Sequence, residues 1–282
     1  MQPDESLKST LMTSPPPSDT RLAALGAGLY RAIPALLAGF VFLAAWELYV
    51  DLSGIKPSIL PAPSRILTQG WLNREALIAN TWPTLGATLG GFALSLAFAF
   101  VSSILMDFMP SMRRALLPIF IGSQTLPLVA IAPLVVLWFG FGLLPKILLV
   151  ALVTFFPLLV ALLQGYEATD RDIAELLNSM KASRWRIFRL ARLPSSLPYF
   201  FAGLRISITY AVVGAIFAEY AGAARGLGIY ILNAKNNFRP DLVLAAVVVS
   251  AVLTLCLFAV TLMIERLVMP LATVPGSAAD DR

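Results

Sequence analysis

Apolar segments of similar length, separated by shorter polar ones, dominate the pattern of this chain. Six of them are close to the roughly 20 residues that a helix needs to cross the hydrocarbon core of a bilayer. They lie at about 31–51, 84–106, 115–142, 146–166, 198–221 and 242–264. The third belongs to a run of thirty uncharged residues that contains Pro118, Pro127 and Pro133, so a kinked helix is expected there. The pattern predicts an all-α integral membrane protein with six transmembrane helices.

The segments outside these spans are predicted to be tails and loops. Residues 1–30 are polar, include SPPPSDT and are predicted to form a disordered cytoplasmic tail. The transmembrane domain is predicted to occupy 31–268, with a basic cytoplasmic loop at 167–197, and 269–282 to form a flexible C-terminal tail. The first apolar run ends in WELYVD rather than in a small-residue cleavage site, so we expect it to be retained as a helix.

The amino-acid composition supports a membrane protein and argues against several kinds of catalytic site. The chain is 58% hydrophobic and 13% charged, about half the charge content of an ordinary globular domain. It has no histidine, and its single cysteine, Cys256, lies in an apolar run. This argues against a metal site and against the histidine-dependent hydrolases. In so hydrophobic a chain, the net charge of +5 is more typical of cytoplasmic loops than of nucleic-acid binding.

Loop charges give the expected orientation. With the N-terminus inside, thirteen of the 21 Lys and Arg residues fall on inner segments and seven on outer ones. By the positive-inside rule, both termini and the loop at 167–197 are predicted to be cytoplasmic. The expected location is the plasma membrane of a bacterium, which is the inner membrane if the cell is Gram-negative.

The loop contains a basic, amphipathic island, ELLNSMKASRWRIFRLARLP, at 175–194. At its start, Ile173, Leu176, Leu177 and Met180 stand at i, i+3, i+4 and i+7, which predicts a helix with one apolar stripe. A second short helical piece follows, which two prolines, at 194 and 198, are expected to end. Physical reasoning alone leaves even odds between a helix that lies on anionic lipid and one that lies on another protein.

The spacing of the island resembles the cytoplasmic signature loop of permease subunits of binding-protein-dependent ABC importers. In that family the loop reads EAA, three residues, Gly, nine residues, Ile, one residue and Leu-Pro. The same places are occupied here by Glu175, Leu176, Leu177, Lys181, Ala191, Leu193 and Pro194. SILPAPSRI (58–66) and SITYAVVGAIFAEYAGAARGLGIYI (206–230) also look like the branch for nitrate, sulfonate, taurine and the thiamine pyrimidine precursor. The resemblance covers about residues 35–268.

This resemblance implies a fold, partners and a contact surface. The fold is that of a type I ABC importer permease, and the partners are ABC ATPase subunits, an extracytoplasmic solute-binding protein and membrane lipid. The loop would dock on the ATPase subunit through Glu175, Leu176, Leu177, Met180, Lys181, Ala182, Ser183, Arg184 and Pro194. Glycine normally permits a tight bend at the place of Lys181; lysine needs either ordinary helical or strained backbone, so no sharp turn is expected there.

No phosphate loop of the form G-x-x-x-x-G-K-[ST] occurs, so the chain is not expected to hydrolyse ATP; ATP and magnesium would be used by the partner. One permease chain with six spans predicts a second copy in a C2 homodimer. No nucleic-acid partner and no bound cofactor are expected.

Few polar side chains lie within the spans. Gln124, Thr125, Tyr210 and Glu219 are the candidates for the translocation path, although an ordinary hydrogen bond between helices is an equally good explanation for the first three. Glu219 is expected to reach water at the outer end of its span, and Arg205 to snorkel at the inner end.

The substrate favoured by the resemblance is the thiamine pyrimidine precursor, with sulfonate, taurine, nitrate and riboflavin as alternatives. An ion-driven secondary transporter would usually carry ionisable groups near the membrane midplane, and the span centres here are nearly free of them. An intramembrane enzyme would need a nucleophile, base or metal site at depth, which the composition makes improbable.

Overall fold

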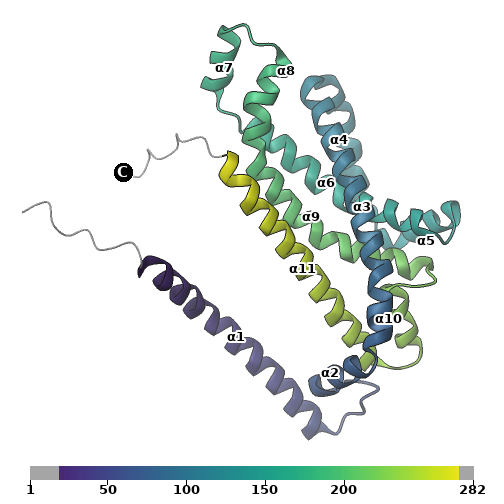
Figure 1. The fold of residues 1–282 in the computed structure, drawn as a ribbon. Helices are drawn as coiled ribbons and strands as arrows, with labels where there is room; N and C mark the ends of the chain where they lie inside the picture. Colours follow the sequence, from purple (N-terminus) through teal and green to yellow (C-terminus); the bar gives the residue numbers. More distant parts are fainter. Residues whose placement is uncertain (1–18, 273–282) are drawn as a thin grey trace, which may run out of the picture. The chain divides into compact units, whose positions relative to one another are not determined.

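The computed structural model describes residues 19–272, which form helices joined by short connections (Figure 1). The chain divides into two units, one made of the segment up to Lys56 with Ala62–Ser64, the other of Pro57–Pro61 with the chain from Arg65 onward. The predicted all-α class is confirmed. Residues 1–18 and 273–282, most of the two predicted tails, lie outside the described residues.

The first unit consists mainly of α1 (Asp19–Ser53). This helix starts inside the segment predicted as a tail and contains an apolar window, Leu36–Ser53, long enough to cross a membrane. Near its end, the carboxylate of Glu47 accepts hydrogen bonds from the amide (3.0 Å) and the hydroxyl (2.5 Å) of Ser64.

The second unit holds the other long apolar helices. These are α3 (Arg74–Phe108), α6 (Leu143–Glu167), the continuous helical stretch Arg184–Gly222 and α11 (Pro240–Ala272). The predicted third span is a bent pair, α4 (Pro110–Gln124) and α5 (Leu128–Phe139), which meet at 101°. In the described chain there are thus five candidate spans, or six if the bent pair counts as one.

The bend of the third span lies at one of its three prolines, Pro127. Pro127 precedes α5 with an extended backbone (ψ 121°), whereas Pro118 and Pro133 lie inside helices. Proline has no amide hydrogen, and it disfavours helical backbone in the residue before it. The run of apolar residues therefore breaks into two helices at 125–127.

The core lies where α6 packs between α3 and α9 (Leu193–Gly222). Met106, Leu158, Leu159 and Leu162 are fully buried in it. The backbones of α3 and α6 approach closely at Gly91, where an added Cβ would lie 2.7 Å from Cγ1 of Val150 and 2.8 Å from a backbone carbonyl oxygen. This contact fixes the spacing of α3 and α6.

Two short helices were not predicted. α2 (Pro63–Leu72) precedes α3, and α10 (Leu227–Asn236) joins α9 to α11. In the second unit, α10 and the beginning of α3 lie at the end opposite to α7 (Arg171–Ser179) and α8 (Arg184–Ile187), as Figure 1 shows.

Candidate functional site: the inner loop and the buried carboxyl group

The first helix of the island, α7, exposes its apolar stripe. The carboxylate of Asp170 caps the helix by accepting the amide of Asp172 at 2.9 Å. Of the stripe, Ile173, Leu176 and Met180 are 49%, 62% and 70% exposed, and none of the residues of α7 is buried. The periodicity in the sequence thus corresponds to a helix on which Ile173, Leu176 and Met180 are exposed, while Leu177 is half-buried.

A sharp turn follows at Lys181, and the expectation of none is therefore wrong. Lys181 has φ +56°, in the left-handed region. Its amide donates to the carbonyl of Asn178 (2.9 Å), and the amide of Ala182 donates to the carbonyl of Leu177 (3.0 Å). These are the two hydrogen bonds of a Schellman cap, in which the left-handed place usually belongs to glycine. They offset the roughly 1–2 kcal/mol that left-handed backbone costs a residue with a Cβ.

The second helix, α8, is anchored in the core. Ser183 begins it by accepting the amide of Arg186 at 3.3 Å. The ring of Trp185 stacks on Phe188 (centroids 5.6 Å apart), and Phe188 is 2% exposed. Phe188 also contacts Tyr166 of α6 at 5.2 Å. The island thus has an outward half, α7, and a half packed onto the spans.

Pro194 and Pro198 do not end this second piece, contrary to expectation. The chain passes from α8 through a π-helical turn, η2 (Phe188–Arg192), directly into α9. The amide of Leu193 donates to the carbonyl of Phe188, five residues back. Pro194 lies in the first turn of α9, and Pro198 lies inside it. A π-turn changes the hydrogen-bond register, so the amides missing at the prolines do not stop the helix.

Ion pairs join the ends of the spans that lie next to the basic loop. Arg192, at the end of η2, pairs with Asp107 at the end of α3. Arg113 of α4 pairs with Glu167 at the end of α6, with Nη2 and Oε1 2.5 Å apart. Arg184, which is exposed, begins α8. The basic residues of the island therefore divide between pairs within the chain and side chains left at the surface.

At the other end of the unit, Glu219 is fully buried, so the expectation that it reaches water is wrong. One carboxyl oxygen, Oε2, accepts the amide of Gly228 at 2.7 Å, and Oε1 accepts the hydroxyl of Thr84 at 2.9 Å. Oxygen Oγ1 of Thr84 in turn accepts the amide of Leu227 at 2.8 Å. The carboxyl group thus joins α9, α3 and the beginning of α10.

The turn before α10 is built around this carboxyl group. Gly226 has φ +139° and donates its amide to Oδ1 of Asn80 at 2.9 Å. A Cβ on Gly226 would overlap the carboxyl group of Glu219. The GLG sequence at 226–228 is therefore required both by backbone conformation and by lack of space.

Comparisons with known proteins agree with this arrangement. Residues 91–270 match the family described as "Binding-protein-dependent transport system inner membrane component". The chain belongs to this family.

The permease is similar to relatives with different named substrates. It is 33% identical to the formylaminopyrimidine transport permease ThiX of Halalkalibacterium halodurans, covering 86% of this chain and 96% of that protein. It is 35% identical to the riboflavin permease RibX of Chloroflexus aurantiacus, covering 81% of this chain and 86% of that protein. It is 31% identical to the taurine permease TauC of Escherichia coli, covering 77% of this chain and 82% of that protein.

Among solved structures, one chain of the MetNI methionine ABC transporter in an inward-facing form matches with a TM-score of 0.62 at 16% identity. The match covers 71% of the permease and 98% of that chain, and it supports the predicted type I fold. The permease is thus a multi-pass membrane protein of the ABC importer class. Its family implies an ATPase subunit and a binding protein as partners. The orientation of the N-terminus stays a prediction.

The predicted path residues of the permease lie in different surroundings. Gln124 and Thr125 lie at the bend between α4 and α5, and Nε2 of Gln124 donates to the carbonyl of Leu152 in α6 at 3.4 Å. Tyr210 is 54% exposed on α9. Glu219 is buried, as described. Their role in transport stays a prediction.

Two basic residues of the permease have partners that the sequence did not indicate. Lys146, at the first position of the fourth predicted span, is on α6, 7% exposed, with Nζ 3.4 Å from the carbonyl oxygen of Arg225. Arg205, expected to snorkel, lies 3.6 Å from Glu265 of α11. A partner on another helix cannot be identified from sequence spacing.

Proposed function

We propose that the permease passes an aromatic nitrogen heterocycle, of the hydroxymethylpyrimidine type that precedes thiamine, from an extracytoplasmic binding protein to the cytoplasm. A separate ATPase subunit, which uses ATP and magnesium, drives the movement through α7. The observation that carries this mechanism is the exposed apolar stripe of α7. A second copy of the chain completes the path as a homodimer.

The surroundings of the stripe favour a protein partner over lipid. Arg171, Asp172 and Glu175 are exposed on the same nine-residue helix. Insertion of this helix into a bilayer would bring its carboxylates toward anionic headgroups, whereas a groove on a protein can accept both kinds of side chain. Burying Leu176 and Met180 contributes about 1.5–3 kcal/mol each. Lys181, in its left-handed turn, and Arg184 then lie at the edge of the contact.

Association of the ATPase subunit tests this surface. In the purified permease, Leu176→Asp and Glu175→Arg are expected to weaken binding of the ATPase subunit at least tenfold, because one removes an apolar contact and the other reverses a charge. Ser179→Ala, on the same helix but away from the stripe, is the matched control and should bind normally. Normal association and uptake in both Leu176→Asp and Glu175→Arg would refute the role of α7.

The substrate class is supported by two independent observations. ThiX and RibX, two of the relatives described above, are named for compounds that contain nitrogen heterocycles. Along α9, Ile206, Tyr210, Val213 and Phe217 form a stripe that is 38–54% exposed. A path lined by aromatic and aliphatic side chains suits a flat ring better than a small charged solute such as nitrate or the zwitterion taurine.

Substrate-stimulated ATPase activity in liposomes identifies the cargo. The permease, its ATPase subunit and its binding protein are tested with the pyrimidine precursor, riboflavin, taurine, an alkanesulfonate and nitrate. Stimulation by the pyrimidine alone, lost in Glu175→Arg, is the expected result. Stimulation by taurine, sulfonate or nitrate alone would contradict the heterocycle assignment and leave the importer mechanism intact.

A further inference from the structure

The connection between α10 and α11 carries an exposed aromatic residue in a left-handed turn. Phe238 has φ +55° and is 79% exposed. Its amide donates to the carbonyl of Lys235 (3.0 Å), and the amide of Arg239 donates to the carbonyl of Ala234 (2.9 Å). This is a second Schellman cap without glycine. The ring gains little burial within the described chain to offset a left-handed conformation that costs about 1–2 kcal/mol.

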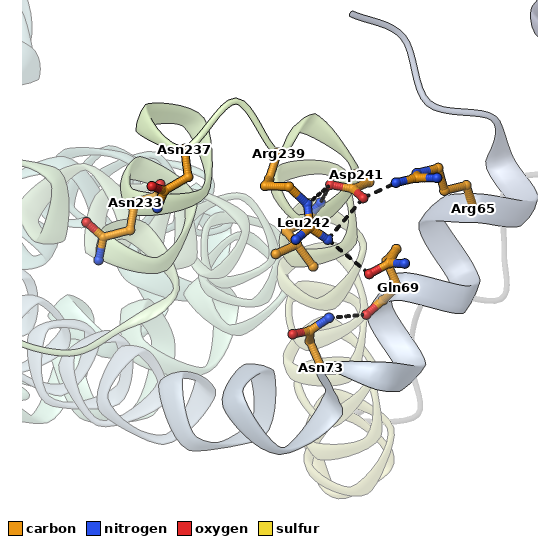
Figure 2. Close-up of polar contacts among 8 residues, drawn as sticks. All are labelled: Arg65, Gln69, Asn73, Asn233, Asn237, Arg239, Asp241 and Leu242. Atoms are coloured by element: carbon orange, nitrogen blue, oxygen red, sulfur yellow. Dashed lines mark hydrogen bonds and ion pairs between the residues drawn. The ribbon is translucent and has the colours of Figure 1, made fainter. Parts of the chain in front are cut away.

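Beside this turn, two arginines share one buried carboxylate (Figure 2). Asp241 is 2% exposed and accepts Nε of Arg239 at 3.0 Å and Nε of Arg65 at 3.4 Å. Nη2 of Arg239 also donates to Oε1 of Gln69 at 3.0 Å, which ties α2 to the start of α11. The hydrogen bond to Asp241 raises the pKa of Arg239 above its ordinary value.

The cluster has an excess of positive charge that faces outward. The side chains of Arg65 and Arg239 are 45% and 42% exposed, against one carboxylate that is almost completely covered. Of the nitrogens of Arg65, Nε is the one that bonds Asp241 in the described part of the chain, which leaves the two terminal nitrogens available as donors. A guanidinium held in this way can donate two parallel hydrogen bonds to a further carboxylate.

We propose that Phe238, Arg65 and Arg239 form a docking surface for a carboxylate-bearing loop of the extracytoplasmic binding protein. The proposal rests on the proposed function and on the predicted orientation. The surface lies at the end of the second unit opposite to α7, where a binding protein would approach if α7 meets the ATPase subunit (Figure 1). Aromatic and arginine side chains that are fixed before binding are the usual anchors of protein interfaces, since they lose little freedom on contact.

The polar neighbours of the turn favour a protein over a lipid surface. Asn233, Lys235, Asn236 and Asn237 are all exposed on the last turn of α10 or just after it. Asn237 donates Nδ2 to the carbonyl of Asn233 at 2.9 Å, and Figure 2 draws both side chains to the left of Arg239. A face rich in amides beside an aromatic ring is typical of a wet protein interface and unlike the apolar faces of the spans.

Binding measurements in membranes of defined composition test the proposal. The permease–ATPase complex is placed in phosphatidylcholine nanodiscs and titrated with its cognate binding protein, at low and high salt. Phe238→Gly, which also relaxes the left-handed turn, and Arg65→Glu are each expected to raise Kd at least tenfold. The control is Arg74→Gln, which removes a positive charge at the same end, where the guanidinium lies 5.0 Å from the ring centroid of Trp71. It should change Kd less than twofold.

The outcomes separate this proposal from the importer mechanism. If the wild-type permease binds the binding protein, and the Kd values of Phe238→Gly and Arg65→Glu both lie within twofold of the wild-type Kd, the docking surface is overturned. The importer mechanism would stand in that case. An effect of Arg65→Glu that appears only when phosphatidylglycerol is added would assign the arginines to a lipid headgroup, and would also overturn it. No binding of the binding protein or of the ATPase subunit to the wild-type permease would overturn the proposed function itself.

Discussion

Replacement of Glu219 by alanine should destabilise the permease strongly, because the buried carboxyl group accepts hydrogen bonds from two other elements. The change removes the acceptor of the Gly228 amide at 2.7 Å and one acceptor of the Thr84 hydroxyl, which keeps the carbonyl of Asn80 at 3.1 Å. A buried amide left without a partner costs about 1–3 kcal/mol. The space left by a side chain with 0% exposure adds a cavity term. Together these effects amount to roughly 3–5 kcal/mol.

Thermal unfolding of the permease in mild detergent measures this effect. A change of 1 kcal/mol shifts the midpoint of a large single domain by roughly 2–4 °C, so a fall of roughly 6–20 °C is expected for Glu219→Ala. Thr84→Val should be destabilising on its own and coupled to Glu219→Ala in a double-mutant cycle. Thr81→Val is the control, since that hydroxyl bonds only the carbonyl of Leu77 in its own helix (2.8 Å). Additive effects of Thr84→Val and Glu219→Ala, or a midpoint unchanged by Glu219→Ala, would refute the reasoning.

Three further predictions concern packing and the inner loop. Gly91→Ala should lower the free energy of unfolding by about 1–3 kcal/mol, because the new Cβ meets Val150. The control Gly86→Ala, with nothing within 4 Å of the new Cβ, should be neutral or stabilising. Equal unfolding midpoints of the two variants would contradict the close contact at Gly91. Lys181→Gly should raise the free energy of unfolding by about 1 kcal/mol, because glycine adopts the left-handed turn without strain. A lower unfolding midpoint in this variant would speak against that turn. Phe188→Leu should leave ATPase association intact but reduce ATP-driven uptake, and unchanged uptake would show that this ring does not transmit motion.

The long helices could be predicted from the sequence because the membrane imposes their length and composition. Every predicted span coincides with a long helix or with the bent pair α4–α5, and the prolines of the third run located its break. The short helices α2 and α10 are held by tertiary contacts instead, such as the hydrogen bond from Arg239 to Gln69. The continuity through Pro194 depended on a π-turn, which no residue pattern indicates.

The candidate site was predictable only where its residues are neighbours in the sequence. The stripe of α7 follows from spacing alone, and so does the exposed position of Leu176. Lysine disfavours left-handed backbone, yet Lys181 adopts it, because the two hydrogen bonds of the helix cap outweigh this preference. Arg65 and Asp241 are 176 positions apart, and Thr84 and Glu219 are 135 apart, so no local pattern could pair them.

The two Schellman caps without glycine suggest why the permease tolerates strain where it does. Glycine is present at Gly91 and Gly226, where an added Cβ would meet atoms of the chain itself. At Lys181 and Phe238 the side chains are exposed, and glycine would give the same turns without strain. The folded chain therefore gains nothing visible from lysine or phenylalanine at these places. Backbone strain at an exposed residue motivates a functional hypothesis, and here it adds to the contacts proposed above for α7 and for Phe238. The two caps lie at opposite ends of the second unit, as those two proposed contacts require (Figure 1).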